Sequence, residues 1–367
     1  MEIRGLNAVG LEEFIHSEEY AQMPNIPISR QRALSHIHNP RKDADDILLF
    51  IGYIDGEMAG YLGILPDVYF INDIPHKFGW ISCMWMNEIM RGMGVTQELI
   101  AEALQKWDGR IIVTEITLPA RTMFIITGFF QEWFTLNGFR GYKKGNLHEI
   151  LTKRKPTLQK MKWGLKLADG LINILSALKT KMGLGKNKNI RIEKIQAPDE
   201  ESLRFIKQFE QKEFNCRGSE AGWMMAWPWV LSSEKGDMDI LQSKYYFSSI
   251  DKRFEFQLLK IYEHDRLLSV ALITIRNNHL KIPYIYFDKA DTEKIVKVIF
   301  GIIMEENIST FTTYNHDISA YMQAHRSPFI YKKEIDRVYL ITPKLYEELP
   351  ENFPICLQDG DGDCVFT

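Results

Sequence analysis

The segment Arg91-Gly-Met-Gly-Val-Thr96 constrains this chain most, because it joins a predicted strand to a predicted helix. Residues 80–86 have the apolar and aromatic character of a buried strand, and an apolar repeat with helical spacing runs from 95 to 107. Gly92 and Gly94 allow close backbone approach, and the unpaired N–H groups of a helix start attract negative charge. The segment therefore predicts a pyrophosphate seat. It is neither the Rossmann nor the Walker form, because GxGxxG and Gly-Lys-Ser/Thr are both absent here.

The elements around this loop predict a mixed, mostly antiparallel sheet flanked by helices. Asp55-Gly56 is a strong hairpin turn between two apolar strands, and the strand, helix and strand around the glycine loop should form a parallel unit. The expected helices are 10–20, 29–37, 91–107 and 120–127, and the expected strands are 46–54, 58–65, 80–86 and 110–117.

This combination resembles the GNAT acyltransferase family, whose signature is Arg/Gln-x-x-Gly-x-Gly/Ala; here Thr96 stands in the last place. The hairpin, the strand before the signature, and the helix and strand after it stand in GNAT order. The resemblance implies an acetyl-CoA-binding domain over residues 1–150 that needs no metal. In the family the strand before the signature splays from its neighbour, and its last residues bind the donor through the backbone. The implied donor-binding residues are Met84, Met86, Arg91, Gly92, Met93, Gly94, Val95, Thr96 and Phe124.

The resemblance also implies direct transfer, in which a base or a water chain deprotonates an amine that attacks the thioester, and a tyrosine often protonates the thiolate. The tyrosine position falls on Phe124, or in a second register on Phe134. Neither side chain can donate a proton. Another donor such as Ser82, Cys83 or water would then serve, or the domain binds acyl-CoA without the usual acid.

The general base is also open, because Trp80 occupies the strand position where many family members carry glutamate. Glu88 lies nearby in the loop after the strand, although its carboxylate could instead face solvent or Arg91. Asp67 stands at the end of the second hairpin strand, where the acceptor cleft should open. An Asp after Pro66 is also a common turn residue.

Two polar runs lie in the region that contacts acceptors in this family, Ser29-Arg-Gln-Arg32 and His36-Ile-His38. Histidines at i and i+2 point to different faces of a helix and make a poor metal pair. The expectation is therefore a surface helix with two incidental histidines.

The second half of the chain, residues 191–367, repeats the element order of the first but has no Arg-x-x-Gly-x-Gly. Its strand at 281–287 runs into Asp288-Lys-Ala-Asp-Thr-Glu293, and acids at a helix start would repel a pyrophosphate. This half resembles a degenerate GNAT-like domain with a structural or acceptor-positioning role, as in tandem bacterial acyltransferases. The expected helices are 199–214 and 291–306, and the expected strands are 254–262, 266–275, 281–287 and 309–314.

Between the halves lies a basic segment, 151–190, in which apolar residues from Leu158 to Met182 follow a helical repeat. From Arg140 to Arg191 there are fourteen Lys and Arg residues against two acidic residues. An amphipathic helical linker is expected. It could contact an anionic membrane surface through 153–188, or its apolar stripe could pack between the lobes while its lysines stay solvated.

Two features near the end of the chain admit two interpretations each. Trp223, Trp227 and Trp229 could line a cleft, although aromatic residues at such spacing are more often core. Asp359-Gly-Asp-Gly-Asp-Cys364 resembles the start of a calcium loop but lacks the later Glu, so an acidic chain end is the expectation.

The length of 367 residues is typical of two domains, and the net charge of −3 argues against a nucleic-acid partner. The start of the chain has no export signal, which predicts a cytoplasmic protein. The predicted fold class is α/β (α+β) with two GNAT-like domains. The predicted function is an N-acetyltransferase that uses acetyl-CoA and a small or macromolecular amine; the alternative is a non-catalytic acyl-CoA-binding protein on a GNAT scaffold.

Overall fold

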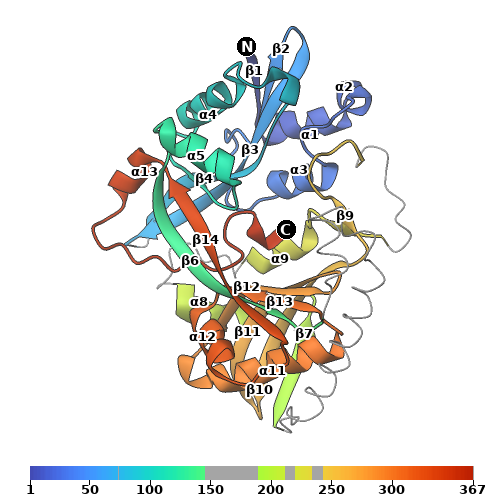
Figure 1. Ribbon diagram of the computed structural model, residues 1–367, viewed down its shortest axis with the longest axis vertical. Helices are drawn as coiled ribbons and strands as arrows, with labels where there is room; N and C mark the ends of the chain where they lie inside the picture. The colour runs from blue at the N-terminus through green and yellow to red at the C-terminus, as the bar shows by residue number, and fades with distance from the viewer. Residues whose placement is uncertain (73, 145–188, 211–219, 234–242, 367) are drawn as a thin grey trace. The chain divides into compact units, whose positions relative to one another are not determined.

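A computed structural model describes residues 1–72, 74–144, 189–210, 220–233 and 243–366 of the protein (Figure 1). They form two compact units, each built from both halves of the sequence. Unit 1 consists of Met1–Leu136, Ala197–Glu255 and Arg337–Thr367, and unit 2 consists of Asn137–Gln196 and Phe256–Asp336. The bounds of these units differ from the contiguous lobes that the sequence predicts. The predicted linker helix, with its membrane-contact segment 153–188, lies outside the described residues.

The sheet of unit 1 has the strand order β1-β2-β3-β4-β5-β14. Strand β4 pairs antiparallel with β3 and parallel with β5, and β14 pairs antiparallel with β5, with Leu340 opposite Val113. Strand β14 comes from the end of the sequence, so unit 1 is completed by residues far from the glycine loop. The strands are β1 (Glu2–Leu6), β2 (Leu49–Ile54), β3 (Glu57–Ile71), β4 (Ile74–Met86), β5 (Ile111–Val113) and β14 (Tyr331–Ile341), of which unit 1 contains the part from Arg337 on.

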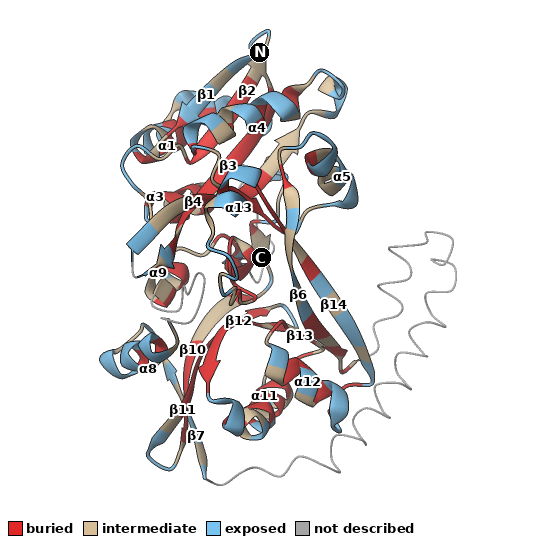
Figure 2. Cartoon of the chain, turned by 90° about the vertical axis from the view of Figure 1, so that its left-hand side faces the viewer, coloured by how far each residue is buried: buried red, intermediate tan, exposed pale blue. Residues whose placement is uncertain are grey.

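Helices cover both faces of this sheet (Figure 1). On one face α4 (Val95–Lys106) and α5 (Leu118–Ile126) enclose a core that includes Leu62, Leu99 and Phe124. On the other face lies a second core, which α1 (Ala8–His16), α2 (Glu18–Gln22) and α3 (Arg30–Ile37) help to form. Figure 2 shows most of β3 and the middle of β4 as buried between these layers, which explains why these stretches are apolar in the sequence.

Local sequence signals account for most element boundaries in unit 1. Asp55 and Gly56 both have positive φ, 52° and 81°, which is the turn that a tight hairpin between β2 and β3 requires. Asn7, Ser17, Ser29 and Thr117 begin their helices as N-caps whose side chains accept backbone N–H bonds. The predicted hairpin and the helices and strand that follow the glycine loop are thus confirmed. Strand β4 is longer than predicted, because it continues a second hairpin with β3.

Unit 2 has the strand order β6-β13-β12-β11-β10-β7, and α11 (Thr292–Glu305) and α12 (His316–Ala324) contribute to its core with Ile299 and Ile318. The predicted hairpin, strand, helix and strand of the second half are confirmed. The strands are β6 (Gln131–Tyr142), β7 (Ile190–Ile195), β10 (Phe254–Glu263), β11 (Arg266–Arg276), β12 (His279–Phe287) and β13 (Thr310–Thr313).

One segment of the predicted second lobe belongs instead to unit 1. Residues 197–255 include α8 (Glu200–Glu210), α9 (Ala221–Ala226) and the short strands β8 (Leu231–Ser232) and β9 (Ile250–Asp251). The segment is anchored by hydrogen bonds: the indole N–H of Trp223 donates to the Ser35 carbonyl at 3.0 Å, and the Ile26 N–H donates to the Lys244 carbonyl at 3.2 Å.

Within the described ranges, no helix combines the length and the apolar character needed to cross a membrane.

Candidate active site

Strand β4 parts from β5 halfway along its length. The two strands pair only at Gly79 with Ile111 and at Trp80 with Ile112, whereas β4 continues to Met86 in register with β3. The stretch after Trp80 therefore has a β3 neighbour but no β5 partner. Met84 and Met86 lie in this stretch, where the resemblance places the donor-binding backbone; their contact with a donor stays a prediction.

A bulge in β4 marks the point of divergence. In the register with β3, Cys83 lies opposite Gly63 and Ile81 lies opposite Ile64, so Ser82 is an extra residue on β4. Such a bulge bends a strand and leaves the extra residue outside the regular ladder. Ser82 is thus the bulge residue two places beyond the last pairing with β5.

The loop after β4 has the geometry of an anion seat. A short 3-10 turn, η1 (Glu88–Met90), leads to Gly92 and Gly94, whose φ angles are 90° and 80°. A Cβ at Gly92 would meet open space, so its conformation and not crowding requires glycine there. In this described loop, α4 begins at Val95 without a side-chain cap. Its first N–H groups therefore have no intrahelical acceptor and are suited to bind phosphate oxygens.

The charged side chains of the loop lie at its surface. Arg91 and Glu88 are 73% and 88% exposed, and their side chains are 4.0 Å apart. Glu88 thus faces solvent beside Arg91, and its role as a base stays a prediction. Thr96 donates its hydroxyl to the Met86 sulfur at 3.4 Å, which connects the first turn of α4 to the end of β4. Met93 is exposed in the same loop.

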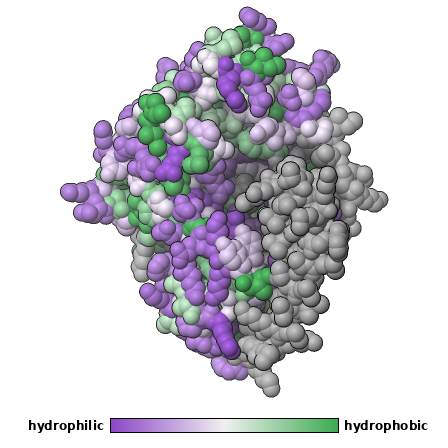
Figure 3. Space-filling view, in the orientation of Figure 1, coloured by the Kyte–Doolittle hydropathy of each residue, from purple (hydrophilic) through white to green (hydrophobic). Residues whose placement is uncertain are grey.

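The position that the family fills with tyrosine is a core position in this chain. Phe124 is fully buried, and its ring lies 4.9 Å from that of Phe130. Its predicted contact with a donor is untested. Apolar side chains do reach solvent on the same helix: Leu118 and Ile126 are 75% and 78% exposed, and hydrophobic surface gathers over α5 in Figure 3.

Asp67 is fully buried on β3, and both of its carboxylate oxygens accept hydrogen bonds. Arg41 binds Oδ1 at 2.5 Å, and the Trp80 indole N–H donates to Oδ2 at 2.6 Å. Arg41 also pairs with Glu220. Burial opposes the positive charge, but these two carboxylates outweigh it and raise the pKa of Arg41. Asp67 thus fixes Trp80 and Arg41, and its role as a base stays a prediction.

A buried polar cluster lies at the bulge, centred on Arg32 of α3. Its Nη2 donates to the Ser82 carbonyl and lies 3.2 Å from a carboxylate oxygen of Asp363, and its Nη1 donates to the Tyr245 hydroxyl at 3.2 Å. The guanidinium carbon lies 3.8 Å from the centre of the Trp229 ring. We call Arg32, Ser82, Tyr245, Trp229 and Asp363 the bulge cluster.

Two neutral groups border the bulge cluster. Burial and the nearby Arg32 charge hold the pKa of His36 well below its usual range, and its Nε2 lies 3.4 Å from the Ser82 hydroxyl. Burial raises the pKa of Cys83, so its thiol is not an activated nucleophile. The indole nitrogen of Trp229 is buried without a hydrogen-bond partner among the residues that the structure describes. The bulge cluster therefore contains the fixed guanidinium of Arg32, the carboxylate of Asp363 and the unbonded indole N–H of Trp229.

The helix that was expected to lie at the surface, α3, turns its polar residues inward. Arg32 and His36 are buried, whereas His38 is exposed and stacks on Trp227 at 4.0 Å between ring centres. The two histidines do point to different faces, as predicted. The expectation of a surface helix with incidental residues is wrong, because Trp229 and Tyr245 cover its inner face.

The acidic segment, residues 356–366, is packed into unit 1. Asp359 accepts from Arg337 at 2.8 Å, Asp361 accepts from the Gln358 N–H at 2.6 Å, and the Phe366 ring stacks on Trp229 at 4.4 Å. The carboxylates of this acidic segment thus pair with donors inside unit 1. In the described part of the chain, no group of His, Cys, Asp and Glu is arranged to hold a metal ion.

Comparison with known proteins supports the resemblance to the GNAT family. Residues 13–122 match the acetyltransferase (GNAT) family. This part of the chain is a GNAT domain. A search of curated proteins finds no significant match to the sequence. The matched range contains α3, the bulge, the glycine loop and α4, which are the elements that define the site.

Solved structures agree with the GNAT fold. A probable N-acyltransferase from Enterococcus faecalis V583 has a TM-score of 0.50 at 10% identity, covering 94% of this chain and 73% of that chain. Saccharomyces cerevisiae N-myristoyltransferase with bound myristoyl-CoA has a TM-score of 0.50 at 9% identity, covering 93% and 78%. A tandem GNAT protein from the clavulanic acid biosynthesis pathway has a TM-score of 0.47 at 10% identity, covering 93% and 98%. At these identities the first two show a shared fold.

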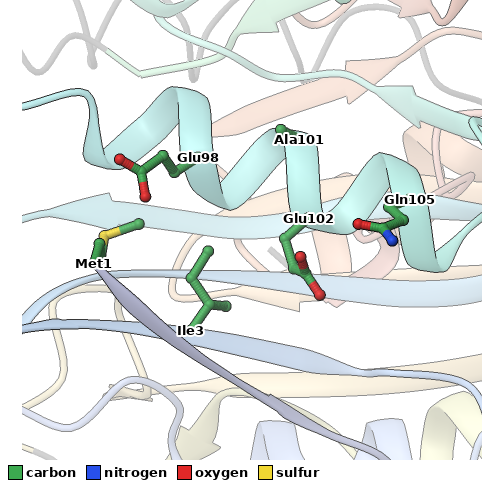
Figure 4. Close-up of a pocket in the computed structure, with 6 residues that line it drawn as sticks. All are labelled: Met1, Ile3, Glu98, Ala101, Glu102 and Gln105. Carbon is green, nitrogen blue, oxygen red and sulfur yellow. The ribbon is translucent and has the colours of Figure 1, made fainter.

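A surface pocket of about 410 Å³ lies elsewhere on unit 1. Figure 4 shows Glu98, Glu102 and Gln105 of α4 on one side of it and Met1 and Ile3 on the other. Two carboxylates at its wall would repel the phosphates of an acyl-CoA. This pocket is therefore not the donor site of the GNAT domain.

Sequence reasoning missed two residues of the bulge cluster, Tyr245 and Asp363, and the structural role of Arg32. Tyr245 and Asp363 are 213 and 331 positions from Arg32 in the chain, so no local pattern relates them. The signals that existed were the Trp-rich run around Trp229 and the acidic segment, both of which stood out in composition. In the structure Trp229 and Asp363 meet at Arg32 of α3.

Proposed function

We propose that the protein is an acyl-CoA-dependent N-acyltransferase that transfers acetyl from acetyl-CoA to an amine of a small molecule or a macromolecule. The observation that carries this proposal is the divergence of β4 from β5 after Trp80, next to an uncapped helix start with two left-handed glycines. The first feature leaves strand backbone open to a pantetheine arm, and the second provides N–H donors for a pyrophosphate.

The proposed reaction is direct attack of the amine on the thioester. Positioning by the open strand, and hydrogen bonding to the oxygen that becomes negative, lower the barrier. Ser82 lies at the bulge and Cys83 beside it, so either side chain or a water molecule serves as donor to the thiolate. The bound myristoyl-CoA of the yeast relative shows that this fold also takes long acyl chains, which makes chain length a variable of the test.

The rival function is acyl-CoA binding without catalysis, favoured by Phe124 in the place of the usual acid and by Trp80 in the place of the usual base. Phe124 is buried and the Trp80 indole bonds Asp67, so neither takes part in proton transfer. The cytoplasmic location remains a prediction from the sequence alone.

Thiol release from acetyl-CoA separates the two functions. The full chain is incubated with acetyl-CoA and primary amines of different classes: a peptide N-terminus, a lysine side chain, glucosamine and spermidine. Myristoyl-CoA is the matched long-chain donor. Amine-dependent thiol release, together with its loss in Ser82→Ala, Glu88→Gln or Asp67→Asn, would support the enzyme and identify the contributing group. Calorimetric binding of acetyl-CoA without turnover of any amine would favour the rival function.

A further inference from the structure

We propose that Asp363 is the general base of this transferase and takes the proton of the acceptor amine at the β4 bulge. The inference rests on the proposed acyltransferase function and identifies a catalytic group that the glycine loop and the strands do not supply. It follows from where the acidic segment crosses the sheet of unit 1.

The acidic segment passes the point where β4 and β5 part. Gly362 lies against Trp80, the last β4 residue paired with β5, and a Cβ at Gly362 would lie 3.2 Å from the indole ring. The next residue is Asp363, whose carboxylate lies 3.2 Å from Arg32 Nη2. That same nitrogen donates to the carbonyl of Ser82 at the bulge. One guanidinium therefore fixes both the carboxylate and the open strand.

The surroundings of Asp363 suit a base that works near neutral pH. Burial raises the pKa of Asp363 to about 6, against the lowering effect of the Arg32 charge; Glu115 also raises it and Arg337 lowers it. Tyr245, Cys83 and His36 lie beyond Arg32, and their shifted pKa values keep all three neutral at pH 7. With 15% of its side chain exposed, the Asp363 carboxylate is accessible to an acceptor amine. A carboxylate with a pKa just below the working pH is ionised and still basic.

The other carboxylates near the site differ from Asp363 in a way that matters. Asp67 binds Arg41 and Trp80 with its two oxygens, and Glu88 is in solvent. Asp359 is 1% exposed and bound by Arg337. Asp361 accepts the Gln358 N–H within its own turn. Asp363 combines partial exposure with a position beside the bulge.

The proton and electron balance is simple. The nitrogen lone pair of the neutral amine attacks the thioester carbonyl carbon, and a C–N bond forms. The Asp363 carboxylate takes the proton that the nitrogen loses. The tetrahedral oxyanion collapses, the C–S bond breaks, and the CoA thiolate takes a proton from Ser82, Cys83 or water. That donor regains its proton from the Asp363 carboxylic acid. The products are an amide and a free thiol, and Asp363 is again ionised.

The test compares Asp363→Asn with Asp359→Asn in the full chain. Both residues lie in the acidic segment and pair with a buried arginine, so both variants remove one ionised carboxylate from the same segment. We expect Asp363→Asn to lower kcat at pH 7.5 by about 100-fold or more, to abolish the rise of kcat/KM near pH 6, and to change acetyl-CoA affinity by less than about twofold. Asp359→Asn should keep the rise near pH 6.

Two results would overturn the proposal. The first is an Asp363→Asn variant that keeps the parent rate and pH profile. The second, independent of any variant's folding, is carboxyl NMR of the aspartate-labelled parent in which no aspartate titrates near pH 6. A parent that binds acetyl-CoA but acylates no amine in the panel would instead refute the transferase function itself, and the base with it. The two failures are therefore distinguishable.

Discussion

The two units contain corresponding strand–loop–helix junctions that differ in one respect. In unit 1, β4 pairs with β5 at only two positions and runs on to the loop before α4. In unit 2, β12 pairs with β13 at His279 to Lys281 and runs on to Phe287, before the loop that leads to α11. Both sheets thus open in the same way. The loops are unlike, because Gly92 and Gly94 form the first, whereas the second contains no glycine.

The loop before α11 ends in a buried carboxylate, that of Asp291. Asp291 is buried at the start of α11, and its carboxylate lies 2.9 Å from Arg266 and 3.2 Å from Lys294. A carboxylate there takes the position and the positive partners that a phosphate would otherwise use. The two sheets open alike, so the proposed donor site depends on the chemistry of the loop and not on the opening of the sheet.

The largest expected effect is that of Gly94→Glu. This substitution would make the loop before α4 resemble the loop before α11. Gly94→Glu places a carboxylate at the helix start and a side chain at φ 80°, a conformation that costs about 1–2 kcal/mol for a non-glycine residue. We expect acetyl-CoA affinity to fall about 100-fold or more by calorimetry. Gly94→Ala is the matched control, since its Cβ has space and no charge; it should lose tenfold at most. Equal losses in both variants would point to strain instead of charge.

A second comparison uses one histidine with a lowered pKa from each unit. Burial lowers the pKa of His36 well below 6.5 and that of His279 to about 3. The unfolded chain therefore binds protons first as the pH falls, so stability is fully present above pH 6.5 and declines below it, by up to about 1.4 kcal/mol per pH unit for each histidine. Denaturant unfolding from pH 7.5 to 5 should show a smaller decline in His36→Gln and in His279→Gln. An unchanged slope in either variant would contradict burial of that neutral ring.

A smaller effect is expected when the anion of unit 2 is removed. Asp291→Ala removes the 2.9 Å partner of Arg266 and one of the two carboxylates beside Lys294, which keeps Glu263 at 2.6 Å. Both cations reach solvent, so we expect a loss of about 1 kcal/mol in unfolding free energy. Acetyl-CoA affinity should stay within about twofold of the parent, because the proposed donor site lies in unit 1. A change in that affinity would break the distinction between the two loops.

The smallest effect is expected for Arg91→Ala. The side chain is exposed and 4.0 Å from Glu88, so it adds a screened charge to the phosphate seat and not a buried contact. We expect a two- to fivefold loss of acetyl-CoA affinity that shrinks further as the salt concentration rises. A loss as large as that of Gly94→Glu would mean that the side chain, and not the backbone, dominates phosphate binding.

The fold was predictable wherever local chemistry sets the structure. The Asp55-Gly56 turn, the glycine loop and the helical repeat from Val95 to Trp107 each specify an element within a few residues. The same holds for the strands and helix around Asp291. The composition of the units was not predictable in this way. Strand β14 joins β5 over 227 residues of sequence, from Val113 to Leu340, and no periodicity reports such a pairing.

The same distinction between local and long-range determinants applies to the candidate site. The donor loop could be located from the sequence because backbone conformation and glycine spacing define it. The bulge cluster could not, because burial of Arg32 and His36 depends on Trp229, Tyr245 and Asp363, which come from distant segments. A polar residue on a predicted helix is normally placed at the surface unless its partner is known. For this reason Asp67 and Glu88 stood out in the sequence and Asp363 did not.

The most direct test of the account is the stoichiometry of acetyl-CoA binding to the full chain, measured by calorimetric titration. We predict one acetyl-CoA site per chain, in unit 1. This site should disappear in Gly94→Glu and persist in Asp291→Ala. Two sites would contradict the distinction drawn between the glycine loop and the Asp291 loop. No binding would contradict the donor site itself and, with it, the acyltransferase function.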